Sequence, residues 1–346
     1  MSPTRYLILA EGFSRDQHYG KTMWGVLRYR RDDVVAILDS TRAPGEQEEG
    51  IPVVQRVDDA LSFEPDTALV GVATQGGRFP PAWIELLRAC IVAGLDVENG
   101  LHVFLSDDRE LRELASRHGV ELRDLRRPPA DLSTATGENL RVPGTIVLTV
   151  GSDCAIGKLT VSLELDLEAR RRGLASVFVP TGQTGIAIAG WGISVDAVVA
   201  DFLAGAAERL VVDGSRRAGG RPEQLLWVEG QGSLVHPVYS GVTLGLFHGS
   251  APHALVLCHQ AGRTEIEGVG GGPHPIPPLA ELVALHERLA LPARPARVTA
   301  VALNTRELAE AEARAAIAAA ERETGLPADD PVRFGAARLV DAVLAV

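Results

Sequence analysis

The feature that most constrains the fold is a buried strand, a glycine-bounded turn and a long helix in direct succession, TIVLTV-GSDCAIGKLT-VSLELDLEARRRG, residues 145–173. In such a segment the turn amides and the positive end of the helix dipole face one point, which suits a phosphate. Gly151 and Gly157 let the backbone approach a ligand, and Lys158 adds a mobile positive charge. The segment therefore predicts a phosphate-binding turn of the P-loop type.

The turn departs from the usual G-x-x-x-x-G-K-[ST] pattern in two places. Ser152 stands where the first glycine would be, and Leu159 stands where the serine or threonine after the lysine would be. Thr160 is the nearest hydroxyl that could serve a magnesium ion. The alternative interpretation is a helix N-terminus that Ser152 or Asp153 caps and that binds nothing.

Strand-like and helix-like runs alternate along the whole chain, which is typical of parallel sheets covered by helices. In the first part we expect strands at residues 6–10, 34–38 and 68–73, and helices at 21–29, 81–93 and 107–118, the last opened by a capping aspartate. In the second part we expect strands at 145–150, 176–179, 225–228, 254–258 and 297–303, and helices at 157–172, 195–210, 279–289, 307–323 and 336–345.

A polar, proline-containing passage without periodicity separates these two parts, RRPP at 126–129 through Thr134–Asn139. We therefore predict an α/β protein of two domains. Residues 1–140 form a Rossmann-like, doubly wound parallel sheet, and residues 141–346 form a P-loop NTPase-like α/β domain. The passage GVGGGPHPIPP, 268–278, is predicted to be a loop that can cover a site.

Two further passages place polar groups where strands of the second domain end. Glu229 ends LLWVE and is followed by Gly-Gln-Gly. Its place at the end of a strand makes it a candidate magnesium ligand or general base. The alternative is an exposed glutamate in an ordinary turn. After the strand at 176–179 comes TGQTG, 181–185, whose hydroxyls and amides could contact a substrate or form a plain glycine-rich loop.

His259 and Arg263 follow the strand at 254–258. His259 is the first candidate for a general base among four neighbouring histidines, whose spacing does not suit a metal site, although each is more often structural. Arg263 could bind a substrate carboxylate. Cys154 is either a nucleophile or a small residue in a tight turn. Asn304 either lies beside a bound base or forms a turn.

Composition narrows the function classes. The formal charge of −11 argues against a sequence-independent nucleic-acid binder, since such proteins need a basic face. The three cysteines fit neither a disulfide framework nor a zinc spacing, which indicates a reducing cytoplasm. No stretch has the ~20 apolar residues of a membrane span, and the start lacks a signal-peptide pattern. In the first domain no G-x-G-x-x-G follows the opening strand. A dinucleotide site there is therefore unsupported, although an acidic residue, Asp39, follows the second strand.

A set of motifs resembles one family, long catalogued as a domain of unknown function, that includes the bacterial D-glutamate N-acetyltransferases. The motifs are GSDCAIGKLT, PTGQTG, DAVVADFLAGAAE, VEGQGSL-HP-YSGVTLGLFHGS, LVLCHQAGR and GLHVFLSDD. The resemblance covers essentially the whole chain and implies acetyl transfer from acetyl-CoA to the amino group of D-glutamate. The turn and VEGQG are also similar, more weakly, to dethiobiotin synthetases, which use ATP and Mg²⁺; there a threonine stands at the position of Leu159.

Three functions follow from these observations. The first is an N-acetyltransferase: the turn holds the phosphates of acetyl-CoA, and Glu229 or His259 takes a proton from an acidic amino acid such as D-glutamate. The second is a ligase or kinase that uses ATP, with Mg²⁺ on Thr160 and Glu229. The third is a nucleotide sensor without catalysis. We expect a small-molecule substrate, no nucleic-acid or membrane partner, and a homo-oligomer.

The candidate site residues fall into three groups. The catalytic candidates are Glu229 and His259. The cofactor-binding candidates are Gly151, Ser152, Asp153, Cys154, Ala155, Ile156, Gly157, Lys158, Leu159, Thr160 and Asn304. The substrate-binding candidates are Thr181, Gly182, Gln183, Thr184 and Arg263.

Overall fold

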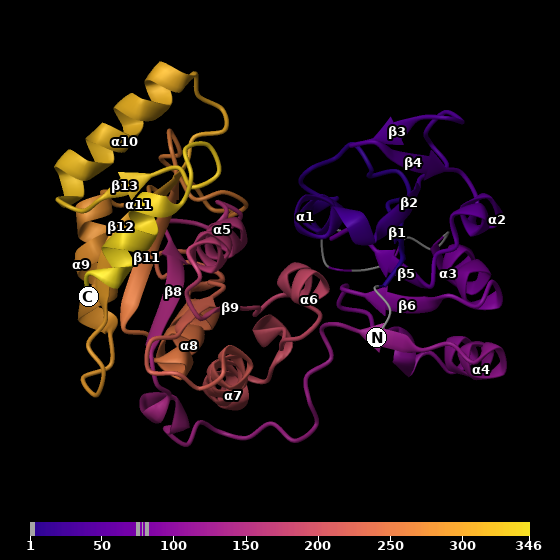
Figure 1. Ribbon diagram of the computed structural model, residues 1–346, viewed down its shortest axis with the longest axis horizontal. Coiled ribbons are helices and arrows are strands. Elements are labelled where there is room, and N and C mark those ends of the chain that lie inside the picture. Colours follow the sequence, from indigo (N-terminus) through magenta and orange to yellow (C-terminus); the bar gives the residue numbers. More distant parts are fainter. Residues whose placement is uncertain (1–3, 74–76, 78, 80–82) are drawn as a thin grey trace. The chain divides into compact units, whose positions relative to one another are not determined.

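The computed structural model describes residues 4–73, 77, 79 and 83–346. It divides into two compact units (Figure 1). The first unit comprises residues 1–128 and 183–197, and the second comprises 129–182 and 198–346. The segment 183–197, placed in the second domain by the sequence analysis, therefore groups with the first unit.

The first unit is built on a seven-stranded sheet of order β3-β4-β2-β1-β5-β6-β7. All its neighbouring strands are parallel except β3 and β4. The strands are β1 (Tyr6–Leu9), β2 (Val34–Leu38), β3 (Gln47–Glu48), β4 (Ile51–Val54), β5 (Thr67–Val70), β6 (Asp96–Asn99) and β7 (Leu122–Asp124).

Helices cover both faces of this sheet. One face packs against α2 (Val57–Ala60), α3 (Trp83–Val92) and α4 (Arg109–His118), and the other against α1 (Lys21–Tyr29) and α6 (Gln183–Ala189). Helix α4 begins after Asp108, whose carboxylate accepts the Leu111 amide. The helix was expected to start at residue 107 with a capping aspartate. The aspartate that caps it is Asp108, one residue later. Residues 81 and 82 of the helix expected at 81–93 lie outside the described residues.

Helix α6 was not expected, since the sequence around it is rich in glycine. It is held by contacts with α1: the hydroxyls of Thr184 and Thr22 lie 2.9 Å apart, and Arg30 of the same unit donates to the Ala187 carbonyl at 3.0 Å. A Cβ on Gly25 would lie 2.8 Å from the Thr184 methyl group. Close packing, rather than helix propensity, therefore stabilises this helix.

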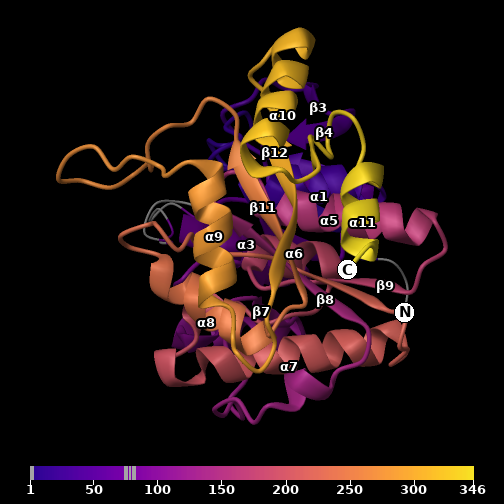
Figure 2. The same cartoon turned by 90° about the vertical axis from the view of Figure 1, so that its left-hand side faces the viewer.

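The second unit has a six-stranded, fully parallel sheet of order β13-β12-β11-β8-β10-β9. Figures 1 and 2 label four of its strands, β8, β9, β11 and β12. Its strands are β8 (Thr145–Gly151), β9 (Ser176–Val179), β10 (Leu225–Val228), β11 (Ala254–Gln260), β12 (Arg297–Asn304) and β13 (Ala328–Asp329). This order, with the flanking helices, confirms the predicted α/β class.

Two helices pack on one face of the second sheet, α5 (Lys158–Arg171) and α11 (Ala337–Leu344). The remaining helices are α7 (Ala200–Ala218), α8 (Ser240–Ser250), α9 (Leu279–Leu289) and α10 (Glu310–Thr324). The helix expected at 195–210 is instead a short 3₁₀ turn, Val195–Ala197, followed by α7. Among the helices of the described residues, none has both the length and the apolar character to cross a membrane.

Candidate phosphate-binding site

The turn between β8 and α5 lies at the carboxyl edge of the second sheet. Two of its residues have positive φ angles, Ala155 at 53° and Gly157 at 111°, and such residues turn successive amides toward one side. In the described part of the chain, the amides of residues 155–160 donate to no other group. Ala155 is exposed and Gly157, Leu159 and Thr160 are partly exposed, whereas Ile156 and Lys158 are buried. The turn therefore reaches the surface, and amides without an acceptor at such a place suit an anion.

Lys158 begins helix α5 and lies buried against the turn. Its Nζ donates to the carbonyl of Asp153 at 2.7 Å. Burial lowers the pKa of Lys158, and the nearby Cys154 and other acidic groups only partly oppose this effect. A bound anion would favour the charged ammonium. A Cβ at Gly151 would lie 3.2 Å from Nζ, so the glycine leaves room for the lysine side chain.

Asp153 is fully buried and organises the turn through three donors. It accepts the Cys154 amide at 2.6 Å, Nη1 of Arg263 at 2.9 Å and the Glu267 amide at 3.1 Å. Arg263 also donates to the Gln260 side chain at 2.8 Å and pairs with the Glu267 carboxylate at 3.1 Å. Only its buried Nε lacks a partner among the described residues. Arg263 thus holds the turn, and its one donor without a partner is buried.

Glu229 follows β10 and ties the ends of two strands together. Its Oε2 accepts the amides of Thr181 and Gly182 at 2.9 and 3.1 Å, and its carbonyl accepts the Thr181 hydroxyl at 2.8 Å. The Gln231 side chain donates to the Thr181 carbonyl at 2.6 Å. Thr181 and Gly182 therefore belong to the same edge of the sheet as the turn.

Gln183 and Thr184, the other two substrate-binding candidates, group with the first unit. The Gln183 side chain accepts Nη2 of Arg126 at 2.8 Å, and Thr184 contacts Thr22 as described above. The TGQTG passage is therefore divided between two environments. Gln183 and Thr184 belong to the first unit, whereas the turn belongs to the second.

His259 lies near the end of β11, with its Nδ1 2.8 Å from the hydroxyl of Ser152 in the turn. Burial lowers the pKa of His259, and the charge of Arg263 lowers it further. Asn304 ends the neighbouring strand β12. Its side-chain oxygen accepts the Arg306 amide at 3.2 Å, which makes it part of a turn at the same edge.

A group of three metal-capable side chains, Asp153, Cys154 and His236, lies beside the turn, with the ligand atoms within 4.8 Å of one another. His236 Nδ1 accepts the amides of Val238 and Tyr239 at 3.1 and 3.3 Å. The neutral ring therefore carries its proton on Nε2, which faces Asp153 at 4.0 Å. A ring in this state directs an N–H at the Asp153 carboxylate and offers no lone pair to a metal ion there.

The magnesium ligands expected for an ATP-dependent reaction are Thr160 and Glu229. Thr160 lies in the first turn of α5 and is partly exposed. One carboxylate oxygen of Glu229 already accepts two amides. These residues lie on the correct edge of the sheet for a metal, but nothing in their contacts selects a metal over other partners.

Comparison with known proteins places the chain in a family. Residues 133–340 match a model described as a domain of unknown function, DUF1611_C, P-loop domain, and residues 39–128 match the DUF1611_N Rossmann-like domain. The chain belongs to the DUF1611 family. This finding confirms the resemblance seen in the motifs, and it confirms the Rossmann-like and P-loop halves.

Similar proteins match most or all of this DUF1611 chain. A protein of Tritonibacter scottomollicae named D-glutamate N-acetyltransferase is 37% identical over 100% of both chains. A second protein of that name, from a Pseudoalteromonas species, is 35% identical over 83% of this chain and 82% of its own length. The crystal structure of a DUF1611 protein from Anabaena variabilis ATCC 29413 has 40% identity and a TM-score of 0.89, covering 99% of this chain and 100% of that one.

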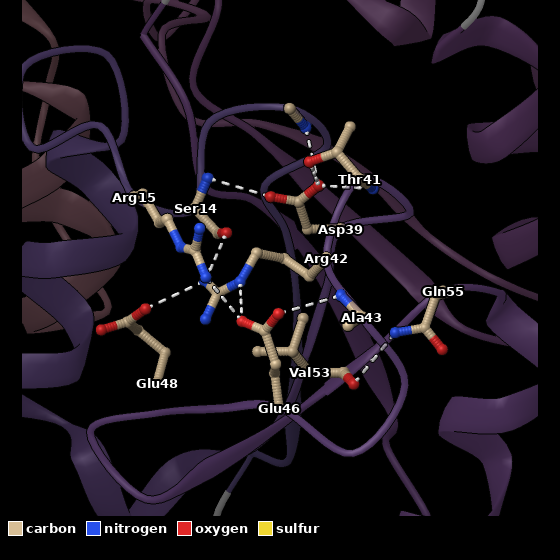
Figure 3. Close-up of polar contacts among 11 residues, drawn as sticks. Ser14, Arg15, Asp39, Thr41, Arg42, Ala43, Glu46, Glu48, Val53 and Gln55 are labelled. Carbon is tan, nitrogen blue, oxygen red and sulfur yellow. Dashed lines mark hydrogen bonds and ion pairs between the residues drawn. The ribbon is translucent and has the colours of Figure 1, made fainter.

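The first unit of the DUF1611 chain has its own polar cluster at the carboxyl ends of β1 and β2 (Figure 3). The buried carboxylate of Asp39 accepts the amides of Gly12, Ser14 and Thr41 at 3.0–3.2 Å and the Thr41 hydroxyl at 2.6 Å. Burial alone would raise the pKa of Asp39, but hydrogen bonds from Ser14 and Thr41 outweigh it and lower the pKa. Asp39 therefore anchors the loop after β1.

Arg42 completes this cluster. Its guanidinium donates to the Ser14 hydroxyl at 3.0 Å and to the carboxylates of Glu46 and Glu48 at 2.6 and 3.0 Å. The same Glu46 oxygen accepts the exposed Arg15 at 2.8 Å. A cavity of about 400 Å³ opens beside these residues, but both arginines and Asp39 already have partners within the cluster.

Sequence reasoning missed the parts of the site that depend on contacts between distant segments. His236, Gln260 and Glu267 all contact the turn or Arg263. His236 and Gln260 lie within the motifs quoted above but were not singled out as site residues, and Glu267 lies outside those motifs. His236 gave one weak signal, since it lies seven residues after Glu229 in the same loop. The Ser152–His259 pair joins residues 107 positions apart, so spacing gave no indication of it.

Proposed function

We propose that this protein is an N-acetyltransferase that moves the acetyl group of acetyl-CoA to the amino group of an acidic amino acid such as D-glutamate. Two full-length or nearly full-length relatives carry the name D-glutamate N-acetyltransferase. The observation that carries the proposal for this chain is the partly exposed turn at residues 155–160, which includes Lys158 and whose amides have no acceptor in the described protein.

In this proposal the turn amides and Lys158 hold the phosphates of CoA. The thioester of acetyl-CoA supplies an activated acetyl group. These residues fit an anion because each one offers a donor, and Asp153 is screened from the ligand by the Arg263 and Glu267 contacts.

The acidic amino acid needs a cation for its carboxylates and a base for its ammonium group. Arg263 is the proposed partner of a carboxylate. Its Nε is buried and its other nitrogens already contact Asp153, Gln260 and Glu267, so a substrate carboxylate would take the place of the exposed Glu267 side chain. Gln183 and Thr184 are occupied within the first unit, so the proposal does not rely on them. Glu229 or His259 takes the proton that must leave before the amine can attack.

Binding and turnover measurements test this proposal. We expect acetyl-CoA to bind in calorimetry without added metal, and D-glutamate to release free CoA at a rate that depends on both substrates. The matched control is L-glutamate at equal concentration. Binding that requires ATP with Mg²⁺, together with phosphate release and no acetyl transfer, would instead support the ligase or kinase. Binding of either ligand without turnover of any amine or acid would support a sensor.

A further inference from the structure

The two residues that could accept the substrate proton, Glu229 and His259, have different surroundings. The carboxylate of Glu229 is buried and accepts the amides of Thr181 and Gly182. A carboxylate that takes up a proton weakens or loses such bonds, since the neutral group is a poorer acceptor. Proton uptake by Glu229 would therefore loosen the link between the ends of β9 and β10.

His259 lacks this constraint. Its ring makes one hydrogen bond, at Nδ1 to Ser152, and Nε2 has no hydrogen-bond partner in the described part of the chain. The ring is partly buried; burial and the charge of Arg263 lower the pKa of His259, and Glu323 opposes them in part. A lowered pKa favours the neutral imidazole, the state that a base needs.

Ser152 is itself held rigidly. It has no exposed surface, and its amide donates to the Cys258 carbonyl at 3.1 Å, next to His259 in β11. A buried hydroxyl in this position is not a nucleophile for a bound substrate. Its oxygen can accept an Nδ1–H, and that bond leaves the ring's lone pair on Nε2.

We infer that His259 is the catalytic base of the acetyl transfer and that Ser152 is a positioning residue that keeps the ring proton on Nδ1. This inference rests on the proposed function. One ammonium proton passes to Nε2, and the amine nitrogen forms a bond to the thioester carbonyl carbon. The C–S bond then breaks, the imidazolium returns its proton to the leaving thiolate, and a second nitrogen proton goes to water. The third stays on the amide product.

The test compares pH profiles of kcat and kcat/KM in wild type, His259→Gln, Glu229→Gln, Ser152→Ala and Ser152→Thr. His259→Gln should lower kcat by about 100-fold and remove the decrease of rate at acidic pH, as expected for loss of a general base. KM for acetyl-CoA should change little. Ser152→Ala should lower kcat less and keep the acidic decrease, and Ser152→Thr, which retains the hydroxyl, should restore kcat.

A second readout uses the wild-type protein and does not depend on activity. The ¹⁵N shifts of the His259 ring report its tautomer, and we expect Nδ1–H. An active wild type whose acidic decrease persists in His259→Gln and disappears in Glu229→Gln would overturn the inference and leave the proposed function intact. An Nε2–H tautomer would also overturn it. A wild type without acetyl transfer would instead refute the proposed function. The tautomer of His259 would then show only whether Ser152 keeps the ring proton on Nδ1.

Discussion

The carboxyl edges of the two sheets carry similar residues but have opposite character. In the first unit, Asp39 accepts four donors and Arg42 donates to Ser14, Glu46 and Glu48 (Figure 3). In the second unit, the amides of residues 155–160 have no acceptor in the described protein. The carboxyl edge of a parallel sheet can therefore bind a ligand where its polar groups have no protein partners.

The largest effect on CoA affinity should come from Lys158→Ala. Loss of a charge-assisted bond to phosphate costs up to about 3 kcal/mol, or about 100-fold in affinity. We expect this loss for CoA in calorimetry, with little change in thermal stability because burial already disfavours the charge of Lys158. The control is Lys21→Ala, an exposed lysine of the first unit. Unchanged affinity in Lys158→Ala would mean that the turn does not hold the ligand.

Asp39→Ala should produce the reverse result. Removal of this carboxylate leaves the buried Ser14 amide and its neighbours without an acceptor, which costs about 1–3 kcal/mol of unfolding free energy. Denaturant unfolding should show this loss, whereas CoA affinity should not change. Asp32→Ala, at an exposed aspartate of the same unit, is the control. A loss of CoA affinity without loss of stability would show that the first edge binds the ligand.

Acid titration should separate the two edges. The pKa of His259 is lowered in the folded protein, so its contribution to stability is complete above the unfolded value of about 6.5 and decreases as pH falls below it. The pKa of Asp39 is also lowered, but from an unfolded value near 3.9, so its contribution is lost only below about pH 4. Unfolding midpoints of His259→Gln and Asp39→Asn between pH 3 and 8 should show these two windows; a shared window would contradict the assignment.

The smallest effect should come from Arg15→Ala. The Arg15 side chain is 70% exposed although it pairs with Glu46, and exposed ion pairs contribute about 0–1 kcal/mol. We expect a change in unfolding free energy of less than about 0.5 kcal/mol and the same CoA affinity as wild type. A clear decrease in CoA affinity would show that the guanidinium groups beside the 400 Å³ cavity take part in ligand binding.

Much of the fold follows from local sequence signals. Strands β9 and β10 and helix α9 begin and end at the predicted residues. Helix α8 was missed because it contains Gly245 and Gly249, which lower helix propensity. In the fold these glycines allow close packing on α7: a Cβ on Gly249 would lie 2.4 Å from the Ala204 carbonyl oxygen. Such a tertiary reason is not visible in a single sequence.

The candidate site also has a part that could be predicted from the sequence and a part that could not. The turn from Gly151 to Lys158 is contiguous, so its strand, glycines and helix could be predicted together. The partners of Arg263 could not be predicted, since Asp153 is 110 residues away in the sequence. An arginine after a strand suggests a substrate clamp, but burial next to a carboxylate makes it first a support for the turn.

A crystal structure with bound CoA would show directly which sheet edge holds the phosphates. We expect phosphate oxygens within hydrogen-bonding distance of the amides of residues 155–160 and of Lys158 Nζ. CoA phosphates bound instead beside residues 12–16 and 39–42 of the first unit, with the turn empty, would contradict this expectation.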